Sequence, residues 1–392
     1  AMKTPQLARC RDILSKFEKS LPLVGLVGEA RAAKLLYLAL VSRLLDRIVS
    51  VVMKGPSTGG KSFVVKTVLQ FFPEDAYSCR TSMSAKALLY SKESFVHRTL
   101  VIYEVAGIQG DFASYAIRSL LSEGQIDYEV TVPDGSGSFT TQRVLKEGPT
   151  GLITTTTDIE LYRDNENRVI SLPVNDTAEQ TVAIMMAYAV GSEGVDFGPW
   201  HELQEWLAEQ PVKVAIPFAP AVAALIPPAS IRLRRDFPLV LSLVISHSLL
   251  HQATRERDAE GRVVATLDDY EVVRELVGDL VSEAAQTSVP QTVRETVTAV
   301  RECLGREIEL QSLSPLCERL GLDKSTVSRR VRQAVDLGHL VDSRPEWERS
   351  GGHPLHLRVG TPLPEDRMVL PTRQAVETYL AESCRVALDP ER

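Results

Sequence analysis

The stretch GPSTGGKS, from Gly55 to Ser62, decides how this chain of 392 residues folds. It follows the apolar run RIVSVVMK, which predicts a strand, and it precedes FVVKTVLQFF, which predicts a helix. Glycines let successive backbone N–H groups turn toward one phosphate at the positive end of a helix dipole. Between a strand and a helix, the pattern G-x-x-x-x-G-K-[ST] therefore predicts a phosphate-binding loop and not a plain turn.

The chemistry of such a loop assigns a role to each of its residues. Lys61 is expected to neutralise the β- and γ-phosphates of ATP, and the Ser62 hydroxyl is expected to ligate Mg²⁺. We expect the nucleotide to contact the whole loop and the helix start, which comprise Gly55, Pro56, Ser57, Thr58, Gly59, Gly60, Lys61, Ser62 and Phe63.

A phosphate loop needs an acid that holds the metal or polarises water, and the run TLVIYE offers one. Glu104 ends this apolar run, which we expect to be a buried strand next to the strand of the phosphate loop. Tyr103 occupies the place of the Asp in the usual Asp-Glu pair. Glu104 is therefore expected to activate water, to bind Mg²⁺ through a shell of waters, or to do both.

The run ITTTT ends a further predicted strand. Threonine suits strands in general, so the run alone says little about function. In a P-loop ATPase, however, a polar residue at this strand tip meets the γ-phosphate and the attacking water. Thr157 is the best placed residue for that role.

Strands alternate with helical runs from YSCRTSM to RVISLPV, which predicts an α/β core with a mainly parallel sheet. A glycine-tipped β-hairpin, IDYEVTVPDGSGSFTTQRVL, interrupts the alternation. A proline-bearing loop, AIPFAPAVAALIPPAS, interrupts the helical patterns that follow. The expected organisation is a helical segment over 1–46, the ATPase core over 47–190, a helical region over 191–290, a further domain over 291–362 and a loosely packed tail over 363–392.

Composition places the chain among ordinary soluble globular proteins, with 44% hydrophobic and 24% charged residues. The net charge of −7 argues against a generally basic nucleic-acid coat but permits a local basic patch. Five cysteines without a CxxC pair indicate neither a zinc knuckle nor a disulfide framework, and a reducing cytoplasm fits best.

The apolar runs predict no signal peptide and no membrane span, so no membrane partner is expected. His247 and His251 have i,i+4 spacing but no nearby third ligand in the sequence. For these histidines we expect a plain helix face and not a metal site.

A second strong signal is LSPLCERLGLDKSTVSRRVRQAVDLGHLVDS, which covers residues 313–343. A short helix ends at Gly321, and Asp323 or Ser325 can cap the next helix. One side of that helix is an apolar stripe formed by Val327, Val331, Ala334 and Val335. Hydroxyls near its start and arginines along its exposed side suit major-groove entry and phosphate anchoring, which singles out Ser325, Thr326, Ser328, Arg329, Arg330 and Arg332.

The segments HLVDSR and LHLRVG supply two strands after this helix. Together with the helices they resemble a winged helix-turn-helix domain. Domains of that type bind DNA, and they also serve as protein docks.

The order of all these features resembles an AAA+ ATPase, and within that class a minichromosome-maintenance-like (MCM-like) helicase, over roughly residues 25–255. LLSEGQIDYEVT is similar to the helix-to-hairpin segment of these ATPases, NRVISLPVND to their arginine-finger segment, and SIRLRRDFPLVLSLVISHSLL to their lid helix. The helix-2 insertion and the N-terminal collar of true MCM proteins are missing. The match is therefore to the wider group, which includes ATPases of phages, plasmids and genomic islands.

The resemblance implies roles for several arginines. Arg168 would be the finger that reaches a neighbour's γ-phosphate, and Arg235 would be the sensor-2 arginine, with Arg232 and Arg234 as close competitors. A finger supplied in trans implies a homo-oligomeric ring, expected to be hexameric. In such rings the hairpin projects into the pore, where Arg143 and Lys146 on its return strand could meet phosphates.

The predicted function is an ATP-dependent DNA helicase or translocase with ATP and Mg²⁺ as cofactors, DNA as its substrate, and primase or initiator proteins as candidate partners. One alternative is a regulatory ATPase, an initiator or helicase loader, that binds DNA through the winged helix without unwinding it. The acidic hairpin tip favours this alternative. Another is a degenerate site, marked by Tyr103, that binds ATP but hardly turns it over.

Overall fold

The computed structural model divides the chain into two units, which are described separately. The first comprises Ala1–Ala221, Phe237–Leu280 and Thr372–Arg392, and the second comprises Val222–Asp236 and Val281–Pro371. The structure describes residues 2–83, 85–103, 111–133, 139–157, 168–175, 177–191, 193–228, 230–287, 289–304, 309–345, 356–363 and 368–388. None of the helices in these ranges combines the length and the apolar character that a membrane crossing requires.

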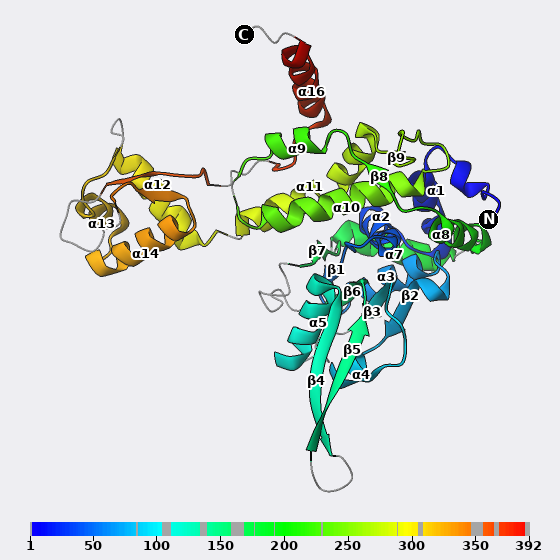
Figure 1. Ribbon diagram of the computed structural model, residues 1–392. Helices are drawn as coiled ribbons and strands as arrows, with labels where there is room; N and C mark the ends of the chain where they lie inside the picture. The colour runs from blue at the N-terminus through cyan, green and yellow to red at the C-terminus, as the bar shows by residue number, and fades with distance from the viewer. Residues whose placement is uncertain are drawn as a thin grey trace. The chain divides into compact units, whose positions relative to one another are not determined.

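The first unit is built on a five-stranded sheet in the order β2-β3-β6-β1-β7 (Figure 1). All of its neighbouring strands pair in parallel. The bounds are β1 (Val51–Lys54), β2 (Tyr77–Arg80), β3 (Arg98–Ile102), β6 (Thr150–Thr156) and β7 (Ile170–Pro173). The predicted α/β core with a parallel sheet is confirmed, and the complete burial of β6 is typical of a strand that is covered on both faces.

The predicted neighbour of the phosphate-loop strand was wrong. We expected the TLVIYE strand beside it, but β6 pairs with β1, and β3 pairs with the far side of β6. The threonine hydroxyls of β6 donate hydrogen bonds to the neighbouring strand β3. The Thr150 hydroxyl donates to the Arg98 carbonyl at 2.7 Å, and the Thr154 hydroxyl donates to the Ile102 carbonyl at 2.7 Å. Threonines thus fit a fully buried strand because β3 accepts their hydroxyl protons.

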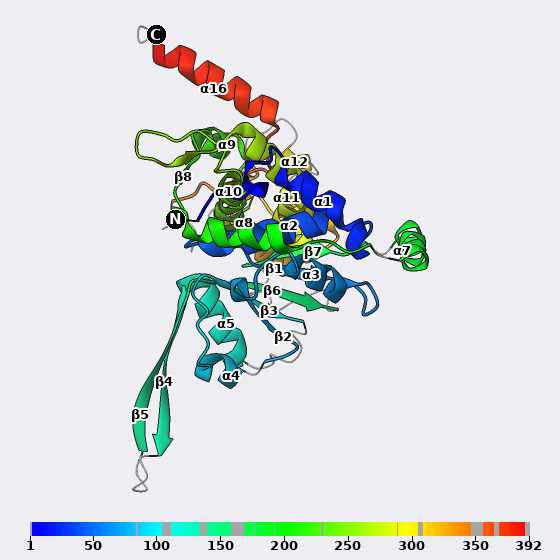
Figure 2. The same cartoon turned by 90° about the vertical axis from the view of Figure 1, so that its right-hand side faces the viewer.

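An aromatic cluster joins the helices that pack beside the sheet. Phe17 of α1 (Ile13–Ser20) lies 4.6 Å from Tyr37 of α2 (Ala30–Val41), measured between ring centroids. Its ring also contacts Phe71 at 4.8 Å and Trp200 of α8 (Gly198–Glu209) at 5.9 Å. Figure 2 shows α1, α2 and α8 on one side of the strands. Phe71 follows the helix of the phosphate loop, α3 (Lys61–Leu69), so the cluster also fixes that helix.

The predicted β-hairpin is confirmed as β4 (Gln125–Pro133) and β5 (Phe139–Glu147), which pair antiparallel. It extends away from the sheet in Figures 1 and 2, and its tip lies outside the described residues. The helices α4 (Ala85–Tyr90) and α5 (Asp111–Glu123) flank its base. Short 3-10 turns lie at Leu7–Arg9, Pro22–Val24, Ser42–Leu44 and Glu74–Ala76.

Two of the predicted irregular segments contain helices. The expected proline-bearing loop begins at the end of β8 (Val214–Ala215) and contains α9 (Ala219–Leu225), whose Pro220 occupies the first turn, where a missing N–H costs little. The expected loose tail contains α16 (Arg373–Leu388), in which Val376 is fully buried. The other helices and strands of the helical region are α7 (Ala178–Val190), α10 (Leu233–Leu250), β9 (Val263–Val264) and α11 (Leu267–Thr287).

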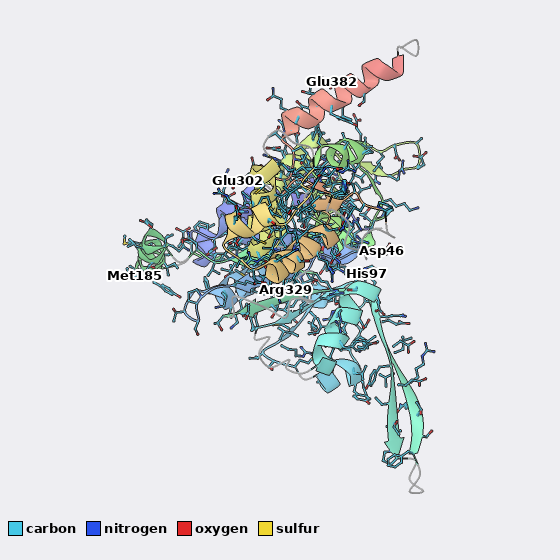
Figure 3. The ribbon with its side chains drawn as sticks, turned by 90° about the vertical axis from the view of Figure 1, so that its left-hand side faces the viewer. Asp46, His97, Met185, Glu302, Arg329 and Glu382 are labelled. Carbon is cyan, nitrogen blue, oxygen red and sulfur yellow. The ribbon has the colours of Figure 1, made fainter. Side chains whose placement is uncertain are left out.

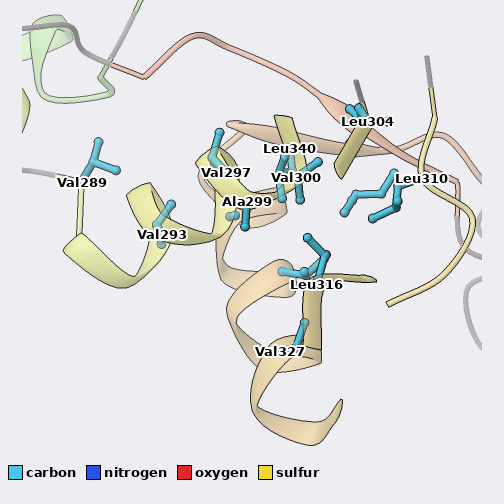
Figure 4. Packing of buried hydrophobic residues seen from close by; sticks show 13 residues of the cluster. Val289, Val293, Val297, Ala299, Val300, Leu304, Leu310, Leu316, Val327 and Leu340 are labelled. Atoms are coloured by element: carbon cyan, nitrogen blue, oxygen red, sulfur yellow. The ribbon is translucent and has the colours of Figure 1, made fainter. Parts of the chain in front are cut away.

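The second unit packs α12 (Gln291–Leu304), α13 (Ser314–Leu320) and α14 (Lys324–Asp336) around one apolar cluster (Figure 4). The predicted stripe on α14 is confirmed, because Val327, Val331 and Ala334 are buried and Val335 packs partly buried against them. The expected pair of strands is present as β10 (Leu340–Asp342) and β11 (Leu357–Val359), which pair antiparallel.

We predict that Phe17→Ala lowers the free energy of unfolding by roughly 3–5 kcal/mol, because it leaves a cavity inside the aromatic cluster. Urea unfolding followed by tryptophan fluorescence measures the change, since Trp200 contacts the Phe17 ring. Phe139→Ala is the matched control, because the Phe139 side chain is 73% exposed on the hairpin and should change the stability little. Equal effects of the two substitutions would contradict the assigned core.

Candidate functional site

The phosphate loop has the predicted position between β1 and α3. Gly60 precedes α3 with a φ of 76°, a left-handed conformation that side chains disfavour, although a Cβ there would meet nothing within 4 Å. No side chain caps the start of α3, and the first N–H groups of an uncapped helix can bind an anion. The predicted contact residues Pro56, Ser57 and Thr58 are exposed.

Two glycines of the loop are also required by packing inside the chain. A Cβ on Gly55 would lie 2.3 Å from Cγ2 of Val174, and a Cβ on Gly59 would lie 3.0 Å from the same atom. Val174 follows β7, and its N–H donates to the Lys54 carbonyl at 3.0 Å. The loop is therefore fixed against the end of β7 as well as by its own turn.

Lys61 carries the positive charge of the loop. Its Nζ donates to the carbonyls of Gly55 at 2.7 Å and Pro56 at 2.5 Å, and burial lowers the pKa of Lys61. Within the described part of the chain, no carboxylate lies within ion-pair distance of this ammonium group. A polyphosphate would supply the missing negative charge. Ser62 follows as a half-buried residue, and the Phe63 side chain is 43% exposed.

The carboxyl ends of the neighbouring strands lie at the same edge of the sheet as this loop. Thr156 pairs with Lys54, so the exposed Thr157 stands at the edge where β1 enters the loop. Glu104 lies outside the described residues, and its predicted roles with water and Mg²⁺ stay predictions. Tyr103 before it is half-buried, with Lys66 Nζ 5.3 Å from its ring centroid. Burial raises the pKa of Tyr103, so it is a neutral phenol that is poorly suited to replace a metal-binding Asp.

Arg168 lies at the opposite end of the sheet from the phosphate loop. Ile170, the first residue of β7, pairs with Val51, the first residue of β1, whereas the loop follows the last residue of β1. Arg168 precedes β7, and its Nε donates to the Ser122 hydroxyl at the end of α5. The length of β1 alone separates the two ends by about 10 Å. The guanidinium of Arg168 is therefore positioned away from the nucleotide loop of its own chain.

The candidate sensor-2 arginines belong to the second unit and differ in their surroundings. Arg232 Nε pairs with Asp236 Oδ2 at 3.1 Å, and the two side chains are only 14% and 8% exposed. Arg234 and Arg235 are exposed near the start of α10. Arg232 is thus engaged within the fold, and the sensor-2 role of Arg235 stays a prediction.

The basic residues of the hairpin are engaged, which the sequence did not predict. Lys146 is 8% exposed, and its Nζ donates to the carbonyls of Ser91 and Glu93 and lies 4.6 Å from the Phe95 ring centroid. Lys146 is therefore removed from the candidate DNA contacts, because it anchors the base of the hairpin. Arg143 is exposed but bound through two nitrogens by Asp127, which raises the pKa of Arg143.

Asp323 caps the start of helix α14, whereas the other predicted cap, Ser325, lies inside the helix. Its carboxylate accepts the N–H groups of Ser325 and Thr326 and also both of their hydroxyl protons, and these hydrogen bonds lower the pKa of Asp323. Both hydroxyls therefore face an approaching ligand as acceptors and not as donors.

The arginines of α14 are not equivalent. Arg330 Nη1 pairs with Glu295 Oε2 of α12 at 3.1 Å, and its side chain is 21% exposed. Ser328, Arg329 and Arg332 are exposed, and Figure 3 labels Arg329 on this helix. Among the described residues, neither Arg329 nor Arg332 has a carboxylate partner. Of the predicted DNA contacts, these two are the guanidinium groups that a phosphate could bind most easily.

The histidine pair has a third neighbour, which corrects the sequence interpretation. Asp269 lies within 4.8 Å of both His247 and His251, and all three are buried. His247 Nδ1 lies 2.6 Å from Asp269 Oδ1. His251 accepts the Ile13 N–H at Nε2, 3.3 Å away, and its Nδ1 lies 3.0 Å from the His247 carbonyl. Since the backbone uses both ring nitrogens of His251 and Arg255 also pairs with Asp269, the cluster links α1, α10 and α11 as a structural network.

Comparisons with known proteins find similarity among solved structures. No protein-family model matches the sequence, and no curated protein matches it. Solved structures do match, among them a full-length MCM homolog from Methanopyrus kandleri, with a TM-score of 0.47 and 14% sequence identity. The match covers 69% of this chain and 59% of that chain, so this chain spans less than two thirds of its length. Similarity at this level does not identify a family.

We predict that acid destabilises the first unit through His251. Burial, with the neighbouring His247 and Arg255, lowers the pKa of His251 from 6.5 to about 4. As the pH falls, the unfolded chain binds this proton before the folded chain does. The contribution of His251 to the free energy of unfolding is therefore fully present above pH 6.5, and roughly 3 kcal/mol is lost as the pH drops to about 4. Urea unfolding at several pH values measures the slope.

His251→Gln should flatten that slope at the cost of lower stability near neutral pH. His201→Gln is the control, since His201 is half-buried and its Nε2 also contacts a backbone carbonyl, that of Gln70. An unchanged slope in His251→Gln would contradict the assignment.

Proposed function

We propose that this chain is an ATPase of the AAA+ type that assembles into a ring and uses ATP to act on DNA. One observation most directly supports a nucleotide site that two neighbouring copies of the chain share. Lys61 and Arg168 occupy opposite ends of one parallel sheet, so a chain cannot supply both to the same phosphate. In a ring, the Arg168 end of one copy meets the Lys61 end of the next, and each interface holds one complete site.

The nucleotide part of the proposal rests on the loop itself. The uncapped start of α3 and the charge of Lys61, which no described carboxylate pairs, suit the phosphates of ATP, and Ser62 with Glu104 would hold Mg²⁺. Bound Mg²⁺ supplies charge neutralisation between the β- and γ-phosphates. Thr157 stands at the same edge of the sheet, where it would orient the attacking water. Arg168 of the adjacent copy would stabilise the charge that develops on the transferred phosphoryl group, with Arg235 as a second candidate.

The DNA part of the proposal rests on the second unit. Its helices and its antiparallel strand pair would form a winged helix, with α14 as the recognition helix. Arg329 and Arg332 would contact phosphates, and the acceptor hydroxyls of Ser325 and Thr326 would face donor groups in the major groove.

A processive helicase or translocase is the specific activity that we propose. The hairpin favours a second candidate, a regulatory switch such as an initiator or loader that binds DNA without moving along it. Its basic side chains are Arg143 and Lys146, and Asp127 pairs the first while the base of the hairpin buries the second. A pore hairpin with no cation ready for phosphates has little electrostatic attraction for a DNA strand.

We predict that Lys61→Ala abolishes ATP hydrolysis and that Arg168→Ala lowers its rate by about 10³-fold or more, the effect of losing an arginine finger. Mixing the two variants should restore activity toward about a quarter of wild type, because random assembly rebuilds that share of the interfaces. Phosphate release measures the rates. Ser122→Ala is the matched control, since it removes the anchor of Arg168 but keeps its guanidinium, and should retain most activity.

A forked DNA substrate in the same reactions separates the two candidate activities. Strand separation that requires Lys61 and Arg168 supports the motor. Hydrolysis without strand separation excludes the motor and leaves the switch. No hydrolysis by the wild-type protein leaves the degenerate site, and failure of mixed variants to recover activity argues against sites shared between copies.

For DNA binding we predict that Arg329→Ala combined with Arg332→Ala weakens affinity for duplex DNA and lowers the slope of log K against log salt by about 1.8, the value for two phosphate contacts. Fluorescence anisotropy between about 50 and 200 mM salt measures that slope. Arg330→Ala should change it less, because Glu295 already pairs that side chain. An unchanged slope in the double variant would indicate that α14 is not the DNA-binding face.

A further inference from the structure

Helix α7 is apolar on every side and yet largely exposed. Its sequence AEQTVAIMMAYAV contains Glu179 as its single charged residue. The exposed fraction lies between 37% and 83% for its large apolar side chains, which are Val182, Ile184, Met185, Met186, Tyr188 and Val190. Figure 2 shows α7 standing apart from the other helices, and Figure 3 labels Met185 on it. A helix that is hydrophobic all round is ordinarily buried, so this helix lacks its cover.

The start of α7 is firmly attached, so the helix is presented in a defined place. Thr177 caps it by accepting the Gln180 N–H, and Gln180 Nε2 donates to the Val27 carbonyl at 2.7 Å. The Gln180 amide fills the space that a side chain at Gly28 would need, since a Cβ there would lie 1.5 Å from its oxygen. Glu29 accepts the N–H of Asn175 at 2.8 Å.

The chemistry of α7 selects a protein as its occupant. Without Lys or Arg it offers nothing to DNA phosphates or to an anionic lipid surface. Its six large apolar side chains each leave more than a third of their surface in water. A contiguous apolar patch of this kind marks a protein interaction site, unlike the single apolar side chains scattered over a monomer surface.

The position of α7 selects a second copy of this chain. Val174, which packs against Gly55 and Gly59, leads from β7 into α7, so the helix begins at the edge of the sheet that carries the phosphate loop. Arg168 lies at the other end of the sheet. The edge beside α7 is therefore the one that another copy must approach to complete the nucleotide site.

We propose that α7 docks into the adjacent copy of this chain and supplies the apolar part of the interface that completes the nucleotide site. This inference rests on the shared site of the proposed function. The contact is head-to-tail, because a symmetric pair of α7 helices would cover only one side of each helix. In a head-to-tail contact, a different surface of the neighbouring copy surrounds the helix.

The test compares Met185→Glu combined with Tyr188→Glu against Met368→Glu combined with Tyr379→Glu. The control changes the same residue types at positions with 44% and 37% exposure elsewhere on the chain. Sedimentation velocity over a range of concentrations, with Mg²⁺ and a non-hydrolysable ATP analogue, measures assembly. We expect the α7 variant to self-associate at least 100-fold more weakly than wild type, and the control variant to associate as wild type does.

Thermal unfolding of dilute, monomeric protein distinguishes the alternatives. We expect the α7 variant to unfold at the wild-type temperature, since the Met185 and Tyr188 side chains are 59% and 78% exposed among the described residues. A lower unfolding temperature with unchanged association would show that α7 packs on its own chain and would overturn the proposal. Wild-type protein that stays monomeric but floats with phosphatidylglycerol-phosphatidylcholine vesicles, and loses this binding in the α7 variant, would also overturn it.

A photocrosslinking amino acid at position 188 identifies the occupant directly. Mixed copies of two different lengths should give a crosslinked band that combines both, whereas a crosslink confined to one chain contradicts the proposal. Binding of a fluorescent ATP analogue separates this inference from the proposed function. Assembly through α7 without ATP binding would refute the ATPase alone, and ATP hydrolysis with wild-type assembly in the α7 variant would refute the role of α7 alone.

Discussion

The parallel pairing of β6, β1 and β7 is the constraint on which the rest of the structure depends. Parallel strands place all their carboxyl ends at one edge of a sheet, and here that edge holds the phosphate loop, Thr157 and Val174. It also places Arg168, which lies two residues before β7, at the opposite end. The same pairing therefore places the loop around Lys61 at one end of the sheet and the candidate finger arginine at the other.

The close contact between Val174 and the loop links this edge to the surface of the protein. Gly55 and Gly59 lack side chains where Val174 packs, so a phosphate loop and an interstrand contact share the same glycines. The chain then continues into α7, which is attached through Gln180 and apolar all round.

The basic side chains of the hairpin and those of α14 differ in how they are engaged. In the first unit, the cations that the sequence placed at the pore hairpin stabilise the hairpin itself, Lys146 through backbone carbonyls and Arg143 through Asp127. In the second unit, Arg329 and Arg332 remain exposed on α14, while Arg330 holds α14 to α12. The proposed contact with DNA phosphates would therefore fall on α14 and not on the two hairpin cations.

The sequence by itself determined the features that depend on local spacing. These include the strand, loop and helix around Lys61, the hairpin, the buried stripe of α14 and the alternation that makes the sheet parallel, because backbone geometry and periodicity act over a few residues. Only the tertiary structure decided which strands are neighbours, that Asp269 joins His247 and His251, and that Lys146 is buried. Apolar periodicity shows that a side chain faces inward, but it carries no record of the distant residue that the side chain meets there.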